Sequence, residues 1–169
     1  HAGHPVAPCN RGQPPTLKAI AVTYKILLFL HLAAIVIWIG GMVFAHFCLR
    51  PAAVQLAPPQ RVPLMHAALD RFFSLVAMAV LATLASGIAM MLMVGMKYAP
   101  PAWHVMFGLG VVMMAIFGHI RFGPFKRLGR CVTAADWPGA ARQLDQIRLL
   151  VTINMGIGFG IIGVVTVGK

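Results

Sequence analysis

The chain has 169 residues, of which 60% are hydrophobic and only 10% are charged, and its mean hydropathy is +0.85. Soluble domains carry about 25% charged residues, so this composition excludes an ordinary soluble domain and predicts one integral membrane domain. Fourteen basic and three acidic residues give a net charge of +11. The basic residues stand between apolar runs and not in a nucleic-acid-binding motif, which favours anionic lipid headgroups over nucleic acid as their partners.

The predicted elements begin with a flexible N-terminal tail at residues 1–17, which lack a long apolar run, followed by one domain at 18–169. A helix needs about 20 apolar residues to cross a bilayer. Stretches of that length lie at about 26–49, 72–96, 101–120 and 149–168. The sequence therefore predicts an all-α integral membrane protein, built as an up-down four-helix transmembrane bundle.

The connections between these spans predict how the bundle is oriented. Pro100 and Pro101 indicate a tight hairpin between the second and third spans. The connections at about 50–71 and 121–148 carry nine Lys and Arg residues, against five on the opposite side. The positive-inside rule then puts both termini in the periplasm of a bacterial inner membrane. The stretch RFGPFKRLGR in the second long connection mixes phenylalanine with basic residues, which predicts a segment on the inner headgroup layer.

Two spans carry histidine pairs at the same spacing. His31 and His46 are fifteen residues apart in the first span, and His104 and His119 are fifteen apart in the third. Ionisable residues inside a membrane are costly and usually functional, although a single histidine can also simply bond neighbouring helices. Fifteen residues rise about 22 Å along a helix and turn through an angle that leaves the two side chains about 60° apart. Each span therefore places one imidazole near each edge of the hydrocarbon.

The first and third helices of an up-down bundle are diagonal across its core. His31 then shares a depth with His104, and His46 shares a depth with His119. This arrangement predicts two stacked b-type haems (or one, if only one pair is occupied), each held by two axial imidazoles. The protein would be a membrane cytochrome b that transfers electrons between the two faces. Its exchange partners would be quinone, a periplasmic redox protein, superoxide or copper.

Haem propionates are anionic, so the same model needs cations at each face. The cations at suitable depth are Lys25 and Lys97 outside, and Arg50 and Arg121 inside. Each ligand ring also needs a hydrogen-bond partner for its second nitrogen. The polar residues at suitable depth in the second and fourth spans are Thr83, Ser86, Thr152 and Asn154.

Methionines near the outer end of the second span favour a different function. Thioethers are soft ligands that suit copper(I). The candidate ligands of an outer copper site are Met90, Met93, Met96, His31 and His104. Methionine also fills irregular gaps in packed cores, which is the simpler interpretation of Met113 and Met114. Copper transport or copper resistance is the alternative to the cytochrome, and a non-catalytic subunit of a larger complex is a third possibility.

Several motifs resemble the copper-resistance protein D family in a four-span form. They are LLFLHLAAIVIWIGG with RP closing the span, RFFSLVAMAVLATLASGI, and WH opening the third span, and the resemblance covers about residues 18–168. It implies a bacterial inner-membrane protein associated with copper uptake or tolerance, and it points to His31, Trp38 and His104. The histidine pattern is also similar to that of di-haem membrane b-type cytochromes, whose diagonal helices each carry two histidines.

Overall fold

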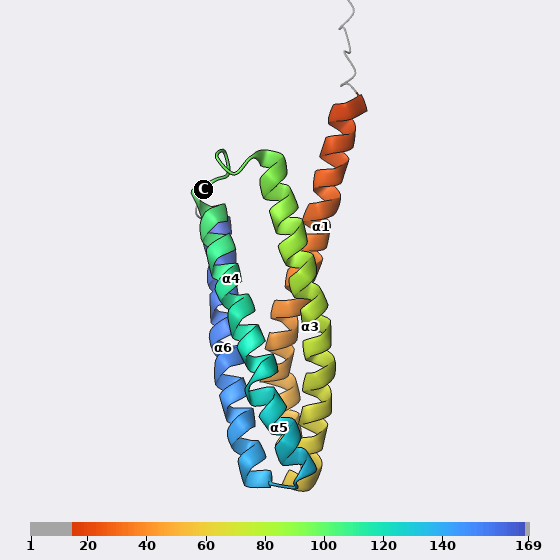
Figure 1. Ribbon diagram of the computed structural model, residues 1–169, viewed down its shortest axis with the longest axis vertical. Helices are drawn as coiled ribbons and strands as arrows, with labels where there is room; N and C mark the ends of the chain where they lie inside the picture. Colours follow the sequence, from red (N-terminus) through yellow and green to blue (C-terminus); the bar gives the residue numbers. More distant parts are fainter. Residues whose placement is uncertain (1–14, 168–169) are drawn as a thin grey trace, which may run out of the picture.

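The computed structural model describes residues 15–167, which are helical apart from short connections (Figure 1). The elements in chain order are α1 (Pro15–Phe44), the π-helical segment η1 (Ala45–Leu49), α2 (Arg50–Ala53), α3 (Pro58–Val94), α4 (Pro101–Phe122), α5 (Pro124–Thr133) and α6 (Trp137–Val167). Four stretches are long and apolar enough to cross a membrane: Leu17–Ala53, Pro58–Val94, Pro101–Thr133 and Trp137–Val167. The predicted all-α, four-span architecture is confirmed. Residues 1–14 of the predicted tail lie outside the described residues, and α1 begins within that tail at Pro15.

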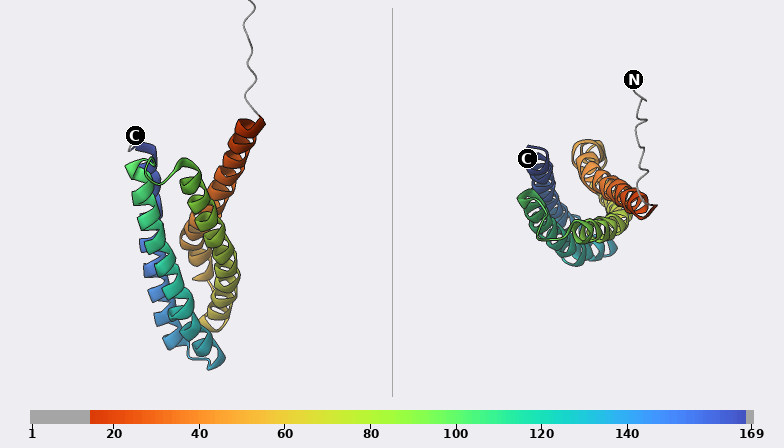
Figure 2. Two further views of the ribbon diagram at one scale, coloured as in Figure 1. Left: turned by 45° about the horizontal axis from the view of Figure 1, so that its top comes forward. Right: turned by 90° about the horizontal axis from the view of Figure 1, so that it is seen from above.

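The four long helices form two antiparallel pairs, in which α1 packs along α3 and α4 packs along α6. We call the end where α1 begins and α6 ends the upper end, and the end that holds α5 the lower end (Figure 1). Seen from above, the ribbon forms a horseshoe whose two arms are α1 and α6 (Figure 2). The two pairs pack closely in the lower half, where α5 contacts α3, α4 and α6.

The hairpin between α3 and α4 follows the prediction from the two prolines. Gly95 ends α3 with a φ of 87°, a left-handed conformation that glycine adopts without a steric penalty. The backbone N–H of Tyr98 donates to the carbonyl oxygen of Gly95 at 2.9 Å, which closes the turn. Pro100 then precedes α4 and Pro101 begins it, where the missing N–H costs no helical hydrogen bond.

The long connections at 50–71 and 121–148 are mostly helical, which the hydropathy pattern did not indicate. The helix α3 begins at Pro58 and α6 begins at Trp137, so both extend far below the predicted spans. Local signals explain these starts. Pro58 stands in the first turn of α3, and the carboxylate Oδ1 of Asp136 accepts from the backbone N–H of Gly139 at 2.9 Å, as an N-cap does.

Most of the basic stretch at 121–130 belongs to the helix α5, and its place on the headgroup layer stays a prediction. Gly123 ends α4, and α5 continues at the lower end with its apolar side turned into the bundle. Phe125 is 3% exposed and Leu128 is fully buried, whereas Lys126 and Arg127 are exposed. The apolar face of α5 is covered because α3 and α6 extend far enough to pack against it.

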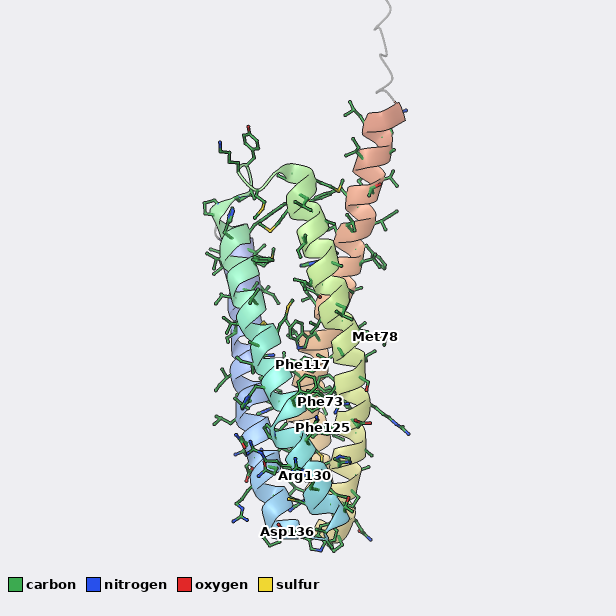
Figure 3. The ribbon with its side chains drawn as sticks, viewed as in Figure 1. Phe73, Met78, Phe117, Phe125, Arg130 and Asp136 are labelled. Atoms are coloured by element: carbon green, nitrogen blue, oxygen red, sulfur yellow. The ribbon has the colours of Figure 1, made fainter. Side chains whose placement is uncertain are left out.

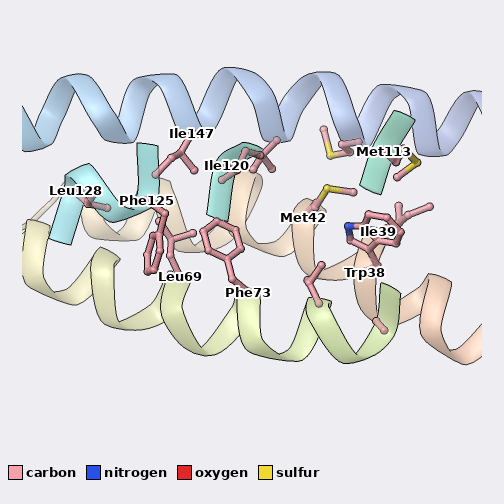
Figure 4. Close-up of a cluster of buried hydrophobic side chains, with 14 of the residues drawn as sticks. Trp38, Ile39, Met42, Leu69, Phe73, Met113, Ile120, Phe125, Leu128 and Ile147 are labelled. Atoms are coloured by element: carbon pink, nitrogen blue, oxygen red, sulfur yellow. The ribbon is translucent and has the colours of Figure 1, made fainter. Parts of the chain in front are cut away.

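Aromatic rings fill the lower half of the core. The ring of Phe73 lies 5.9 Å from that of Phe117 and 5.1 Å from that of Phe125, both in edge-to-face geometry (Figures 3 and 4). The ring of His66 stacks on the other side of Phe125 at 5.0 Å. Large apolar side chains such as Phe29 cover the outside of the helices, as expected for surfaces that face lipid tails.

Candidate functional site

His31 is a buried histidine whose ring is held by the neighbouring helix. It is 7% exposed on α1, and its Nδ1 lies 3.0 Å from the backbone oxygen of Thr83 and 3.0 Å from the hydroxyl of Ser86. Both residues were predicted partners for a histidine ring, and both are confirmed, Thr83 through its carbonyl. A carbonyl oxygen only accepts hydrogen bonds, so Nδ1 carries the hydrogen. The lone pair of Nε2 is then available to a metal ion.

A cavity of about 90 Å³ lies beside His31, in the upper half of the bundle. All four long helices contribute to its wall, which is almost entirely apolar. The lining residues with metal-binding or aromatic side chains are His31, Trp38, Met91, Met106, Phe107, Met113 and Met114. Figure 4 shows the lower edge of this region, with Trp38 and Met113 near Ile39 and Met42. The cavity combines one imidazole with four thioethers, and no carboxylate belongs to its lining among the described residues.

Two glycines give the cavity wall its shape. A β-carbon on Gly87 of α3 would lie 3.2 Å from Cε1 of His31, closer than nearly all real contacts of this kind. A β-carbon on Gly158 of α6 would lie 2.9 Å from Cδ1 of Ile39. The absence of side chains at these two positions therefore leaves the space that His31 and Ile39 occupy.

The methionines predicted as copper ligands lie apart from this cavity. Met90 is buried in α3, Met93 is 40% exposed and Met96 is 58% exposed, and none of them lines the cavity wall. Met91, the neighbour of Met90, lines the cavity with His31 instead. A step of one residue turns a helix by about 100°, so the same MMLM run presents different thioethers to different faces. The signal that would have found Met91 is its spacing of four residues from Gly87, one helical turn along the same face.

The structure does not bring His31 and His104 together. His104 is exposed near the start of α4, its Nδ1 lies 3.3 Å from the backbone oxygen of Pro100, and it does not line the cavity. Trp38, the third residue that the resemblance indicated, is 3% exposed and does line it. Ligation by a His31–His104 pair stays a prediction.

The two histidines of the lower pair, His46 and His119, do not line a common cavity among those described. His46 is half-buried in η1, and its Nδ1 lies 3.2 Å from Oγ1 of Thr152, a predicted partner that is confirmed. His119 is exposed on α4. The fourth predicted partner, Asn154, is buried and directs Nδ2 toward Sδ of Met42 at 3.8 Å, so it does not contact either histidine.

His46 lines a second cavity, of about 250 Å³, near the lower end. Arg50, one of the predicted propionate partners, also lines it and pairs with Asp145 at 3.4 Å. Arg121 pairs with Asp70 at 3.5 Å and lies over the ring of Phe125. The two cations predicted for the outer face, Lys25 and Lys97, are both exposed.

Within residues 15–167, no group of three or more His, Cys, Asp or Glu side chains could hold a metal ion. Soft thioether and imidazole ligands select copper(I) over hard cations such as magnesium or calcium. The cavity beside His31 offers both kinds of ligand in one place.

Comparison with known proteins gives one family match. No curated protein and no solved structure matches the chain significantly. The model of the family described as copper resistance protein D matches residues 66–167, more than half of the chain. This region comprises most of α3 and all of α4, α5 and α6. The chain therefore belongs to the copper resistance protein D family.

Proposed function

We propose that this protein binds copper(I) in the cavity beside His31 and passes it on within the membrane, as part of copper tolerance. The observation that carries this proposal is the fixed ring of His31 at the wall of a cavity lined by four methionines. The excess of basic residues in the two long connections favours a bacterial inner membrane with the lower end in the cytoplasm. Copper would then reach the cavity from the periplasmic side.

The chemistry of the wall suits transfer better than storage. An apolar cavity strips water from an ion, and a cation there is stabilised only by direct ligands. The ligands available are a neutral imidazole and neutral thioethers, which suit the soft, singly charged copper(I) ion. Without a carboxylate to compensate its charge, the bound ion remains easy to release.

A competition titration with a chromophoric copper(I) chelator tests this proposal on the full chain under reducing conditions. We expect one copper(I) site per chain, with an affinity that is weakened at least about tenfold in His31→Gln and in Met91→Leu, a change of tenfold being about 1.4 kcal/mol. Met91→Leu nearly conserves volume and so keeps the fold. Met93→Leu is the matched control because Met93 lies outside the cavity. Equal affinities for the wild type and both cavity variants would contradict the proposal.

A second candidate function is electron transfer by b-type haem. Its support is the hydrogen bond from Nδ1 of His31 to the Thr83 carbonyl, which is the usual way to orient a metal-binding histidine. His104 and His119 are exposed and line neither of the two cavities, so each haem would have only one axial histidine at a cavity. The residues therefore fit haem only in part. We rank electron transfer second for that reason. Its partners would be quinone, superoxide or a periplasmic redox protein.

One spectrum separates the two functions. A dithionite-reduced minus oxidised spectrum of membranes and of purified protein, with haem and copper quantified per chain, is expected to show copper without haem. Sharp low-spin bands with two haems per chain would establish the cytochrome instead. In that case His46→Ala or His119→Ala would remove one haem and spare the other.

A further inference from the structure

The second cavity carries an unusual concentration of positive charge. It lies where η1, α2, α3 and α6 meet, and its charged lining consists of Arg50, Arg61, Arg148 and Asp145. Oδ1 of Asp145 lies 3.4 Å from Arg50 and 3.7 Å from Arg148. One carboxylate oxygen thus forms ion pairs with two guanidinium groups.

The remaining charge of this cavity is not neutralised by the protein. Of the three acidic residues in the chain, Asp70 pairs with Arg121, and Asp136 caps the start of α6. Within residues 15–167, Arg61 has no carboxylate at ion-pair distance. Three guanidinium groups beside one carboxylate leave two positive charges in excess. Guanidinium groups in a fork geometry bind phosphate oxygens strongly, so the cavity matches a phosphate group.

Apart from His46, the rest of the wall of this cavity is apolar. Met65, Leu69 and Phe72 line it from α3, and Ile147 and Val151 line it from α6. A free inorganic anion would leave this surface exposed to water, whereas an acyl chain would cover it. The cavity also borders η1, and π-helical turns occur frequently at functional sites.

We propose that the second cavity is a binding site for an anionic phospholipid. The lipid phosphate lies among Arg50, Arg61 and Arg148, and one acyl chain runs over Leu69 and Phe72. The position of the cavity agrees with this occupant, because the long basic connections are predicted to face the anionic inner leaflet. The site is separate from the cavity beside His31, so it stands whether or not copper binds there.

Native mass spectrometry of the full chain, delipidated in mild detergent, tests this proposal together with thermal unfolding. The probes are dioleoylphosphatidylglycerol, dioleoylphosphatidylcholine and inorganic phosphate. We expect one tightly held phosphatidylglycerol per chain that raises Tm, about tenfold weaker binding of phosphatidylcholine, and no shift in Tm with phosphate alone. Arg61→Gln and Arg148→Gln are each expected to weaken phosphatidylglycerol binding about tenfold, and Arg61→Lys, which keeps the charge but loses the fork, is expected to weaken it less than Arg61→Gln does.

Arg71→Gln is the matched control, since Arg71 is an exposed arginine of α3 outside the cavity. Equal losses in Arg71→Gln and Arg61→Gln would overturn the proposal, because binding would then depend on diffuse basic charge. Equal stabilisation by inorganic phosphate would overturn the assignment to a lipid. A retained mass matching haem or a quinone in place of phospholipid would overturn it as well.

Discussion

The ring of His31 packs directly against the backbone of Gly87, so closely that a β-carbon at residue 87 would lie 3.2 Å from Cε1. One turn earlier on the same helix, the carbonyl oxygen of Thr83 accepts the hydrogen bond from Nδ1, the ring atom bonded to Cε1. Two consecutive turns of α3 therefore orient this imidazole, one through a hydrogen bond and the other through a missing side chain. The orientation exists before any ligand arrives, which lowers the cost of binding one.

Replacing Gly87 with valine is expected to displace the His31 ring and to weaken copper(I) binding at least about tenfold. The added methyl groups enter space that the ring occupies. The chelator competition titration measures this effect. The control is Gly160→Val on α6, because a β-carbon at residue 160 meets no atom within 4 Å. Unchanged affinity in Gly87→Val would show that ring orientation does not matter for copper.

Ser86→Ala removes one of the two hydrogen-bond partners of His31 and keeps the other. Loss of such an outer-shell contact typically lowers metal affinity by about 10- to 100-fold, and we expect the low end here because the Thr83 carbonyl remains. Ser74→Ala on the same helix is the matched control, since the Ser74 hydroxyl is exposed and bonds only within its own helix. A loss of equal size in both variants would point to an effect on α3 as a whole.

Phe73→Ala is expected to lower the free energy of unfolding by about 3 kcal/mol. The side chain is 2% exposed and contacts two other aromatic rings, so its removal leaves a cavity in the packed lower half. Reversible unfolding in mixed micelles measures the change. Phe29→Ala truncates the same side chain at a position that is 69% exposed to lipid, and it should change stability far less.

Asp136→Ala is expected to cost about 1 kcal/mol by removing the cap at the start of α6. Asp136→Asn keeps an oxygen that accepts from the Gly139 N–H, so it should lose only a few tenths of that amount. Thermal unfolding of both variants checks the difference. Equal destabilisation by the two substitutions would indicate that the charge of Asp136, and not its hydrogen bond, stabilises this end.

Hydropathy predicted the four membrane helices, and Pro100 and Pro101 predicted the hairpin, because both features rest on local sequence. It missed the lower extensions of α3 and α6, since a helix needs no apolar residues once it leaves the hydrocarbon. There, its start depends on caps such as Asp136 and on prolines such as Pro58. The extensions also explain why the apolar face of α5 is buried by protein and is not left to the headgroup layer.

The sequence predicted how deep the site residues lie along the helices, but not toward which neighbours their side chains point. Depth grows linearly with residue number along a helix, so Thr83, Ser86 and Thr152 could be predicted as partners of histidine rings, and each lies beside one. Direction depends on helix rotation, and in this chain both the lipid-facing and the core-facing sides are apolar, so the pattern carries little information about it. This is why Met91 was overlooked in favour of Met90.

The aromatic cluster at Phe73, Phe117 and Phe125 has a consequence for how the family can diversify. The cluster fills the lower half, whereas the wall of the upper cavity includes Met106 and Met114, which are only partly buried, beside the buried Met113. Substitutions at Met106 or Met114 therefore change the ligand set at a smaller cost in folding than substitutions at Met113. Metal preference can therefore change through substitutions in the upper half of the molecule while the lower half preserves the fold.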